Sequence, residues 1–495
     1  MPDRESDIVV IGSGPTGAAA ALALADQHAS ITMLESGTSL PGGLVLQADG
    51  RNLIRRGRDV GNQHAYTSST DPEIIWYHEL APGGLSNHWT CAVPRYHPDD
   101  FRDGERLHEK FRWPVTYDDL EPYYAQMEKV MGVSGSDTSP TVLPPPVLRH
   151  RRTLPSAWQP VSRIASARDR AFVPMPLATG RGWGVKSGGT PFNSFTDVVL
   201  GLKRAGRIKL RLGAHALRLE HDESGEVDRV VYFDRETNRE ASIGCQAVVV
   251  AAGTIASTKL LLDSTSSQFP SGLGNHNGLL GRFLHDHVLD MCAIELDQRL
   301  PRLGHEAYFT RAPQADSAPL LAAGCVLGGR LSALDRLLTL TPIPARVFGM
   351  IMFGTMVPLE SNRVESHSAT DEYGLPQVDI QIQFRDEDKA TTRKARQDFL
   401  DILDEAGLGP RVRWNLDVLT PGAAVHFGGT VRMHDSPEYG LTNAWGRLHS
   451  VKNVVVADAS VFTTCVEKNP TLTAMALGAR SAERLALDLK SGSLG

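Results

Sequence analysis

Cysteine is scarce in this chain, and long apolar runs are missing from it. The 495 residues include five scattered cysteines: Cys91, Cys245, Cys292, Cys325 and Cys465. Because they form neither a metal-ligand pair nor a dense disulfide framework, we expect a reduced protein without a metal site. No uninterrupted stretch approaches the roughly 20 apolar residues of a membrane helix, so we expect no membrane partner.

The chain also lacks a strong surplus of either charge and any long basic run. Its formal net charge is −6 at pH 7, which gives no reason to expect a nucleic-acid partner. The opening residues, MPDRESDIVV, do not place an apolar stretch after a basic one, so no secretory signal is expected and a cytoplasmic location is predicted. The length predicts two or three domains.

The strongest pattern lies in the first 35 residues. A β-branched run at residues 7–11 predicts a buried parallel strand, residues 18–25 predict an alanine-rich helix, and residues 30–34 predict a second strand. The sequence Gly-Ser-Gly-Pro-Thr-Gly, residues 12–17, lies between the first strand and the helix. This order is typical of a dinucleotide-binding fold, whose helix N-terminus faces the phosphates.

Each glycine of this turn has a physical role in such a fold. Gly12 permits the tight turn, Gly14 lets the backbone approach a pyrophosphate, and Gly17 lets the helix pack closely on the strand. Glu35 ends the second strand, where its carboxylate can accept hydrogen bonds from an adenosine ribose. That carboxylate argues against NADP, but it does not choose between FAD and NAD.

Beyond the first 35 residues, glycine-rich segments typical of nucleotide binding occur in some parts of the chain and not in others. Beyond about residue 288 the glycine-rich signals stop, and they return near residue 425. We expect strands at 206–219, 227–233, 247–252, 378–384 and 453–458. The strand at 378–384 alternates strictly between apolar and polar residues, so one of its faces is expected to meet solvent. We expect helices at 255–263 and 386–405, and a closing helix that ends at about residue 489.

These patterns predict an α/β protein with two domains. Residues 1–287 and 425–495 are predicted to form a discontinuous Rossmann-like domain, with a lid or connection near 133–185. Within it, residues 134–152 are rich in Ser, Thr and Pro and are predicted to be a surface connection. Residues 288–424 are predicted to form an α+β substrate-binding domain on an antiparallel sheet.

Four segments, in matching order over nearly the whole chain, resemble the glucose–methanol–choline (GMC) oxidoreductases. They are the opening fold, residues 83–92 (GGLSNHWTCA), residues 251–254 (AAGT), and residues 426–430 (HFGGT) with NPTLT at 469–473 downstream. Within the family, the chain is most similar to the branch of pyranose 2-oxidase and bacterial C-glycoside 3-oxidases. The resemblance implies FAD as cofactor, a secondary hydroxyl of a pyranose sugar or glycoside as substrate, a ketone as product, and oxygen or a quinone-like molecule as electron acceptor.

The resemblance also assigns roles to residues of the cofactor site. Backbone near Ala216 would touch the adenine, and Asp458 would contact the diphosphate or ribityl region. Residues 84–91 would run beneath the isoalloxazine ring. The residues expected to bind the cofactor are Gly12, Gly14, Pro15, Thr16, Gly17, Glu35, Gly84, Asn87, His88, Thr90, Cys91, Ala216, Ala252, Gly253, Asp458 and Thr471.

His426 and Asn469 match the catalytic pair of that branch. Oxidation of an alcohol requires a base for the hydroxyl proton, and an unperturbed imidazole is available as a base near pH 7. Asn469 can hydrogen-bond the substrate oxygen, although an amide before Pro470 can also cap a helix. We expect Gly428 and Gly429 to allow close approach of the flavin ring.

Other histidines leave alternatives open. In pyranose 2-oxidases the His of a Ser-Thr-His-Trp segment carries a covalent bond to the flavin, whereas here His88 follows Asn87, so covalent and non-covalent FAD both remain open. The His-Asp-His sequence at residues 285–287 is expected to pack near the cofactor and not to bind a metal.

Rival functions remain at this point. An aminoglycoside, aminocyclitol or other natural-product alcohol would use the same machinery, at a secondary or a primary hydroxyl. A flavin-binding protein without turnover and a NAD-dependent dehydrogenase are more distant alternatives. We expect a monomer or a dimer.

Overall fold

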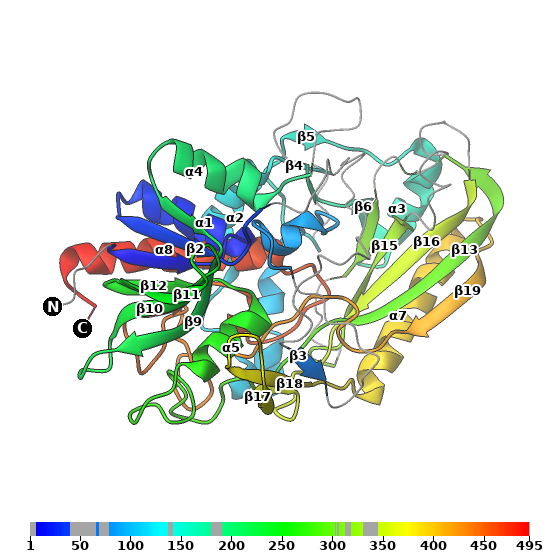
Figure 1. Cartoon of the computed structure of the whole chain (residues 1–495). Helices are drawn as coiled ribbons and strands as arrows, with labels where there is room; N and C mark the ends of the chain where they lie inside the picture. Colours follow the sequence, from blue (N-terminus) through cyan, green and yellow to red (C-terminus); the bar gives the residue numbers. More distant parts are fainter. Residues whose placement is uncertain are drawn as a thin grey trace.

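The computed structural model describes most of the chain and divides it between a parallel and an antiparallel sheet (Figure 1). The described residues are 6–39, 79–136, 142–179, 191–301, 303, 306–311, 318–329 and 345–494, together with the backbone of 66–68. Within them, no helix is long and apolar enough to span a membrane.

The parallel sheet gathers strands from the beginning, middle and end of the chain. Its order is β20 (Val454–Val456), β12 (Ala247–Val250), β1 (Ile8–Ile11), β2 (Ile31–Glu35) and β8 (Lys209–Leu212). The side chains of β1, β12 and β20 are valine, isoleucine and alanine and are all buried, as expected of a sheet covered on both faces. The nucleotide-type fold is thus discontinuous.

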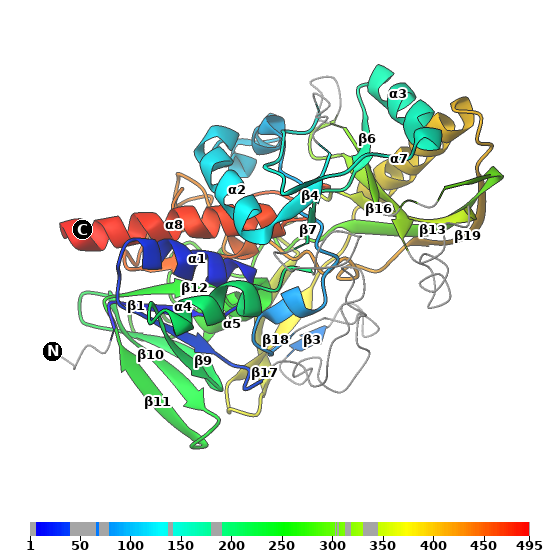
Figure 2. The ribbon, with the colours of Figure 1, turned by 90° about the horizontal axis from the view of Figure 1, so that it is seen from above.

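Helices and a meander cover the two faces of this sheet (Figure 2). Helices α1 (Pro15–Asp26) and α8 (Thr471–Ser491) pack against each other, and α2 (Tyr117–Met131) packs on α8. The antiparallel meander of β9 (Ala214–His221), β10 (Val227–Asp234) and β11 (Arg239–Gly244) contacts the sheet from the other side, next to α5 (Thr254–Asp263).

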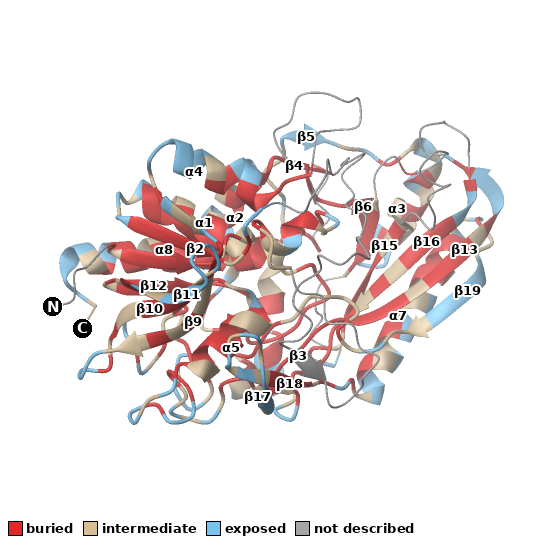
Figure 3. Ribbon diagram, in the orientation of Figure 1, coloured by how far each residue is buried: buried red, intermediate tan, exposed pale blue. Residues whose placement is uncertain are grey.

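The antiparallel sheet has six strands and its own apolar core. The order is β19 (Arg411–Val418), β13 (Val288–Leu300), β16 (Ala345–Gly354), β15 (Ala323–Gly329), β14 (Ala307–Thr310) and β6 (Ala171–Pro174). Helices α3 (Gln159–Ala167) and α7 (Asp386–Glu405) pack on it through buried aromatic rings, among them Trp158, Phe172 and Phe399. The buried middle strands and the exposed edge strand β19 are visible in Figure 3.

The remaining elements are short or lie at the junction of the two halves. A fourth sheet, after the parallel sheet, the meander and the antiparallel sheet, joins β17 (Arg363–Thr370) and β18 (Pro376–Gln381) to the backbone of β3 (Tyr66–Ser68). A fifth joins β5 (His150–Arg151), β4 (Val133–Gly135) and β7 (Leu177–Ala178), and α4 (Leu200–Arg204) lies near α1.

Several expectations from the sequence need correction. The run 206–219 is two strands, because Gly213 takes a φ of +71° and turns the chain from the parallel sheet into the meander. The Ser-, Thr- and Pro-rich segment 134–152 is not confined to the surface, since it begins in the buried strand β4. The strand near 378 lies outside that sheet and ends at Gln381, although its apolar side chains are buried as the alternation predicts.

A buried ion cluster ties the two halves together beneath Asn469. The Nζ of Lys468 lies 2.9 Å from Asp100 in the 3₁₀ helix Pro98–Phe101 and 2.6 Å from Glu467. Glu467 also accepts a hydrogen bond from Thr310 of β14. All three charged side chains are almost fully buried.

We expect Lys468→Met to lower the free energy of unfolding by about 3–5 kcal/mol, because it leaves two carboxylates buried without their cation. Chemical denaturation followed by circular dichroism measures this loss. Lys452→Met, at an exposed lysine, is the control. Equal stability of the two variants would contradict the role given to the cluster.

Candidate active site

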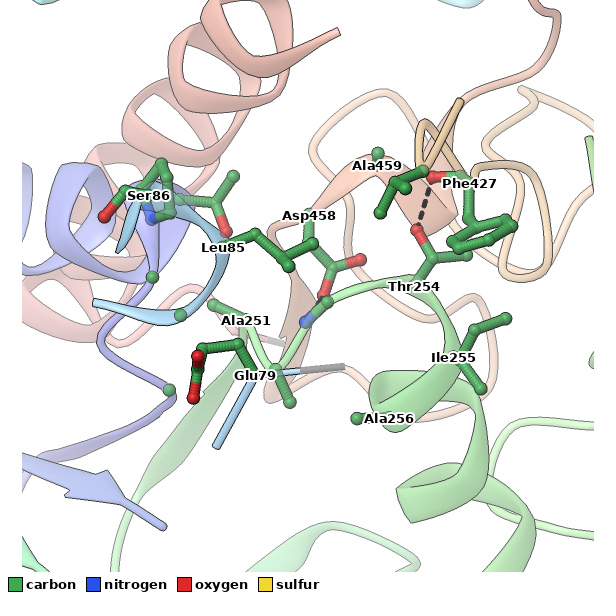
Figure 4. Close-up of a pocket in the computed structure, with 18 of the residues that line it drawn as sticks. Glu79, Leu85, Ser86, Ala251, Thr254, Ile255, Ala256, Phe427, Asp458 and Ala459 are labelled. Carbon is green, nitrogen blue, oxygen red and sulfur yellow. Dashed lines mark hydrogen bonds between the residues drawn. The ribbon is translucent and has the colours of Figure 1, made fainter. Parts of the chain in front are cut away.

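A cavity of about 610 Å³ lies at the carboxyl ends of the parallel strands and reaches the antiparallel sheet. This is the edge at which open parallel sheets bind ligands. Figure 4 shows Leu85 and Ser86 on one side of the cavity, Thr254 and Ile255 on the other, and Asp458 between them.

The glycine-rich turn borders one end of the cavity. A Cβ atom on Gly14 would meet no protein atom within 4 Å, so the backbone there faces open space. Pro15 and Thr16 line the cavity beside it, at the N-terminus of α1. Gly17 does not line the cavity: a Cβ there would lie 2.1 Å from the carbonyl oxygen of Gly12, so its role is close packing of helix and strand.

Glu35 lines the cavity and braces the turn. Its carboxylate accepts hydrogen bonds from the backbone N–H and the hydroxyl of Ser13, at 3.0 and 2.5 Å, and from the N–H of Gly37 at 2.7 Å. Burial raises the pKa of this carboxyl, and the hydrogen bonds oppose the shift. The Ser13 hydroxyl also accepts from the N–H of Gly83, which joins the turn to the segment 83–92.

Asp458 orders the middle of the cavity. One carboxylate oxygen accepts from the N–H of Gly253 at 3.0 Å and from the Ser257 hydroxyl at 2.5 Å. The other accepts from the N–H and the hydroxyl of Ser460. Burial raises the pKa of Asp458. The bonds from Gly253 and Ser257 hold the backbone of Ala252 and Gly253, which line the cavity, at the start of α5.

The segment 83–92 contributes some of its expected residues and not others. Gly84, His88 and Thr90 line the cavity. Asn87 does not: its amide donates to the carbonyls of Gly84 and Pro82, so it shapes the 3₁₀ turn Gly84–Asn87. Cys91 is also outside the lining and is only 2% exposed. His88 pairs through Nε2 with the carboxylate of Glu79.

His426 and Asn469 meet at the other end of the cavity. The amide nitrogen of Asn469 lies 3.3 Å from Nε2 of His426, and both residues line the cavity. The Nδ1 of His426 lies 3.3 Å from Nδ1 of His287. Burial lowers the pKa of His426 to about 4, so its imidazole is neutral at neutral pH. The side chain of Asn469 does not cap α8.

The carboxylate of Asp286 holds the loop that carries His426, a role that sequence reasoning missed. Its two oxygens accept from the N–H groups of Gly422, at 3.0 Å, and His426, at 2.9 Å. The side chain is fully buried, and burial raises its pKa to about 6. The His-Asp-His sequence marks Asp286 as a residue of interest, but only the fold shows that it contacts residues 422–426.

Gly428 and Gly429 make room for a protein side chain instead of the flavin ring. A Cβ on either glycine would lie within 2.6 Å of a ring nitrogen of His285, and neither glycine lines the cavity. In the described part of the chain, no three His, Cys, Asp or Glu side chains form a metal-binding group. The five cysteines are buried and free.

The remaining expected residues lie along the cavity between its two ends. Ala216 of β9 lines it close to Glu35, and Thr471, the first residue of α8, lines it close to Asn469. The structure therefore brings 15 of the 18 expected residues to one cavity, and it places Gly17, Asn87 and Cys91 behind its wall.

Fold and site together define a dinucleotide-fold oxidoreductase with a histidine–asparagine pair. A family model described as GMC oxidoreductase matches residues 358–478. The chain is 31% identical to 6'''-hydroxyparomomycin C oxidase of Streptomyces lividus, over 98% of this chain and 92% of that protein. The chain belongs to the GMC oxidoreductase family.

Other known proteins agree with this assignment. The chain is 28% identical to 2-methyl-1,2-propanediol dehydrogenase of Mycolicibacterium austroafricanum (97% of this chain, 95% of that protein). It is 26% identical to C-glycoside 3-oxidase of Microbacterium trichothecenolyticum (97% and 96%). Among solved structures, pyridoxine 4-oxidase from Mesorbium loti superimposes with a TM-score of 0.67 at 17% identity, over 98% of this chain and 99% of that one, and supports the fold.

GMC oxidoreductases bind FAD, and the residues of the cavity fit this cofactor. The open space at Gly14, beside the positive end of the α1 dipole, suits a pyrophosphate. The Gly253 backbone also borders open space, and a Cβ there would meet no protein atom within 4 Å. At one end, Glu35 can accept from ribose hydroxyls, and at the other, residues 88–90 and 426 leave room for a ring system.

Two glycine variants separate packing from cofactor binding. We expect Gly17→Ala to destabilise the fold, because its Cβ would overlap the Gly12 carbonyl. Gly14→Ala should fold like the wild type but bind FAD weakly, because its Cβ fills the pyrophosphate path. Thermal melting and the flavin absorbance of each purified variant measure the two effects. A Gly14→Ala protein that retains full flavin would contradict the placement of the pyrophosphate.

Proposed function

We propose that the protein is an FAD-dependent oxidoreductase that converts a secondary hydroxyl of a pyranose glycoside to a ketone. The observation that carries the proposal is the His426–Asn469 pair at one end of a cavity whose other end carries Glu35. The catalytic and cofactor-binding roles of these residues are part of the proposal. The C-glycoside 3-oxidase relative supports a glycoside as substrate.

The histidine–asparagine pair binds and deprotonates the substrate hydroxyl in this proposal. The amide of Asn469 donates to the substrate oxygen and holds it beside Nε2 of His426, which takes the hydroxyl proton. When bound, FAD supplies the two-electron acceptor for the hydrogen on the carbinol carbon. The polar groups are already aligned before substrate enters, which lowers the cost of positioning it.

His287 sets which nitrogen of His426 acts as the base. In this proposal the backbone of Val466 binds His287 in the tautomer that carries its proton on Nε2, and Nδ1 of His287 is the acceptor that faces His426. His426 then carries its proton on Nδ1 and presents an unprotonated Nε2 to Asn469 and the substrate. Asp286 fixes the backbone of the same loop.

The side of the cavity formed by the antiparallel sheet favours a substrate with an apolar face. Leu289 and Met291 of β13 and Ile351 and Phe353 of β16 line the cavity near His426. A pyranose ring can place its C–H face on such a wall. The same wall gives support to a second candidate, a small branched alcohol of the kind named for the propanediol dehydrogenase relative.

An aminoglycoside, as named for the Streptomyces lividus relative, finds less support. Its amines need free carboxylates close to the base. Among the described residues, none of the acids that line the cavity contacts His426 or Asn469 through its side chain: Glu79 pairs with His88, Asp263 and Asp371 pair with Lys259 at the tip of the β17–β18 hairpin, and Glu35 and Asp458 accept from backbone N–H groups.

Anaerobic mixing of the yellow protein with candidate alcohols tests the function. We expect a glycoside to bleach the flavin absorbance, and His426→Ala to slow that bleaching by about 10²–10⁴-fold, the usual contribution of a general base. His367→Ala, at a histidine outside the cavity, is the control. Readmission of air shows whether oxygen or a quinone-like molecule is the acceptor.

The lowered pKa of His426 predicts how the rate of flavin bleaching changes with pH. Because the pKa of His426 is lowered to about 4, the base is already deprotonated at pH 5 and above. The rate of bleaching should stay level from pH 8 to about 5 and fall as the pH drops through 4. A rate lost near pH 6.5, or His426→Ala equal to the wild type, would contradict the proposal.

We also propose that FAD is held without a bond to His88. The Nε2 of His88 pairs with Glu79, and a bond from this nitrogen to the flavin would break that pair. Acid precipitation should therefore release all the yellow colour into the supernatant. Colour retained in the pellet of the wild type, and lost from that of His88→Ala, would show a covalent link.

A further inference from the structure

The hairpin between β17 and β18 reaches the cavity at the end that carries Glu35. Its tip contributes Asp371, Tyr373 and Leu375 to the lining, near Ala216 of β9. The sequence places this hairpin in the stretch expected to bind substrate, between residues 288 and 424. In the fold, it lies beside α5, among the elements of the dinucleotide half (Figure 1).

Aromatic contacts attach the hairpin tip to the meander. The ring of Tyr373 stacks on His215 of β9, with centroids 4.6 Å apart and planes inclined by 21°. It also contacts Phe233 of β10 at 5.1 Å, and its hydroxyl accepts a hydrogen bond from Arg235 at 2.7 Å. Nδ1 of His215 in turn lies 2.9 Å from the hydroxyl of Ser36, the residue after Glu35.

Lys259 of α5 binds the hairpin through an ion pair and a hydrogen bond. Its ammonium group lies 2.7 Å from Asp263, 3.2 Å from Asp371 and 2.6 Å from the carbonyl oxygen of Pro376. The side chain is buried and lines the cavity. Asp371 also accepts from the N–H groups of Tyr373 and Leu375, which shapes the turn.

The charges at this end of the cavity favour the adenine of a dinucleotide over its phosphates. Asp263 and Asp371 carry two formal negative charges against the single charge of Lys259, and the three donors of the ammonium group are already used. A phosphate would be repelled here. The amino group of adenine is a donor and finds carboxylate acceptors, while the ring finds the apolar side chain of Leu375.

We propose that the hairpin tip, residues 371–375, closes the adenine end of the FAD site, with Lys259 and Tyr373 holding it in place. This inference rests on FAD as the cofactor. It assigns part of the cofactor site to a hairpin that lies more than 330 residues from the glycine-rich turn in the sequence.

The dissociation constant of FAD tests this assignment. Holoenzyme is diluted stepwise, and the fluorescence of the released FAD is measured for the wild type, Tyr373→Ala, Leu375→Ala and Lys259→Met. We expect Tyr373→Ala and Leu375→Ala to raise the dissociation constant about tenfold, which is about 1.4 kcal/mol. The far-UV circular dichroism spectra of Tyr373→Ala and Leu375→Ala should match the spectrum of the wild type. The same measurement shows whether Lys259→Met still folds, since this variant leaves two carboxylates without their cation.

Thr370→Ala is the matched control, because Thr370 is exposed, precedes the tip directly and does not line the cavity. Its dissociation constant should equal that of the wild type. Folded Tyr373→Ala and Leu375→Ala holoenzymes that release FAD no more readily than Thr370→Ala would overturn the inference and leave the proposed function intact. A wild-type protein that neither contains nor binds FAD would instead overturn the proposed function.

Discussion

Three buried carboxylates hold the loops around the cavity, and each does so by accepting hydrogen bonds from backbone N–H groups. Glu35 binds the glycine-rich turn, Asp458 binds the turn before α5, and Asp286 binds the loop that carries His426. A buried carboxylate without such donors is costly, so chain segments that place N–H groups around it are favoured. Burial raises the pKa of all three groups, as this environment requires.

The two sheets meet the cavity in different ways. The parallel sheet presents strand ends, where backbone N–H groups and a helix N-terminus suit phosphates and ribose. The antiparallel sheet presents the apolar side chains of β13 and β16. His426 and Asn469 lie between these surfaces, on loops that are held by Asp286 and by the buried cluster around Lys468. In the proposed function, this arrangement would place the base His426 between the cofactor ring and the apolar substrate wall.

Local patterns explain why part of this could be predicted from the sequence. The strand–turn–helix unit of the first 35 residues and the helix Asp386–Glu405 follow from residues close to one another in the chain. The break at Gly213 was missed, because a single left-handed glycine separates two strands of similar composition. The resemblance to a known family, not spacing, supplied most of the candidate site.

Long-range contacts explain what could not be predicted. No local pattern joins Asp286 to residues 422–426, and none brings the hairpin tip at 371–375 beside Glu35. Gly428 and Gly429 had suggested room for a flavin ring, whereas the fold fills that room with His285. In each case the partner lies far away in the sequence, and only the assembled sheets determine which residue it is.

A crystal structure of the protein with FAD tests the central claim most directly. The account predicts that FAD runs along the cavity described above, with its ribose at Glu35, its pyrophosphate at Gly14 and its ring system beside His88 and the His426–Asn469 pair. FAD bound elsewhere, or a flavin ring that lies away from His426 and cannot share a substrate with it, would contradict the account.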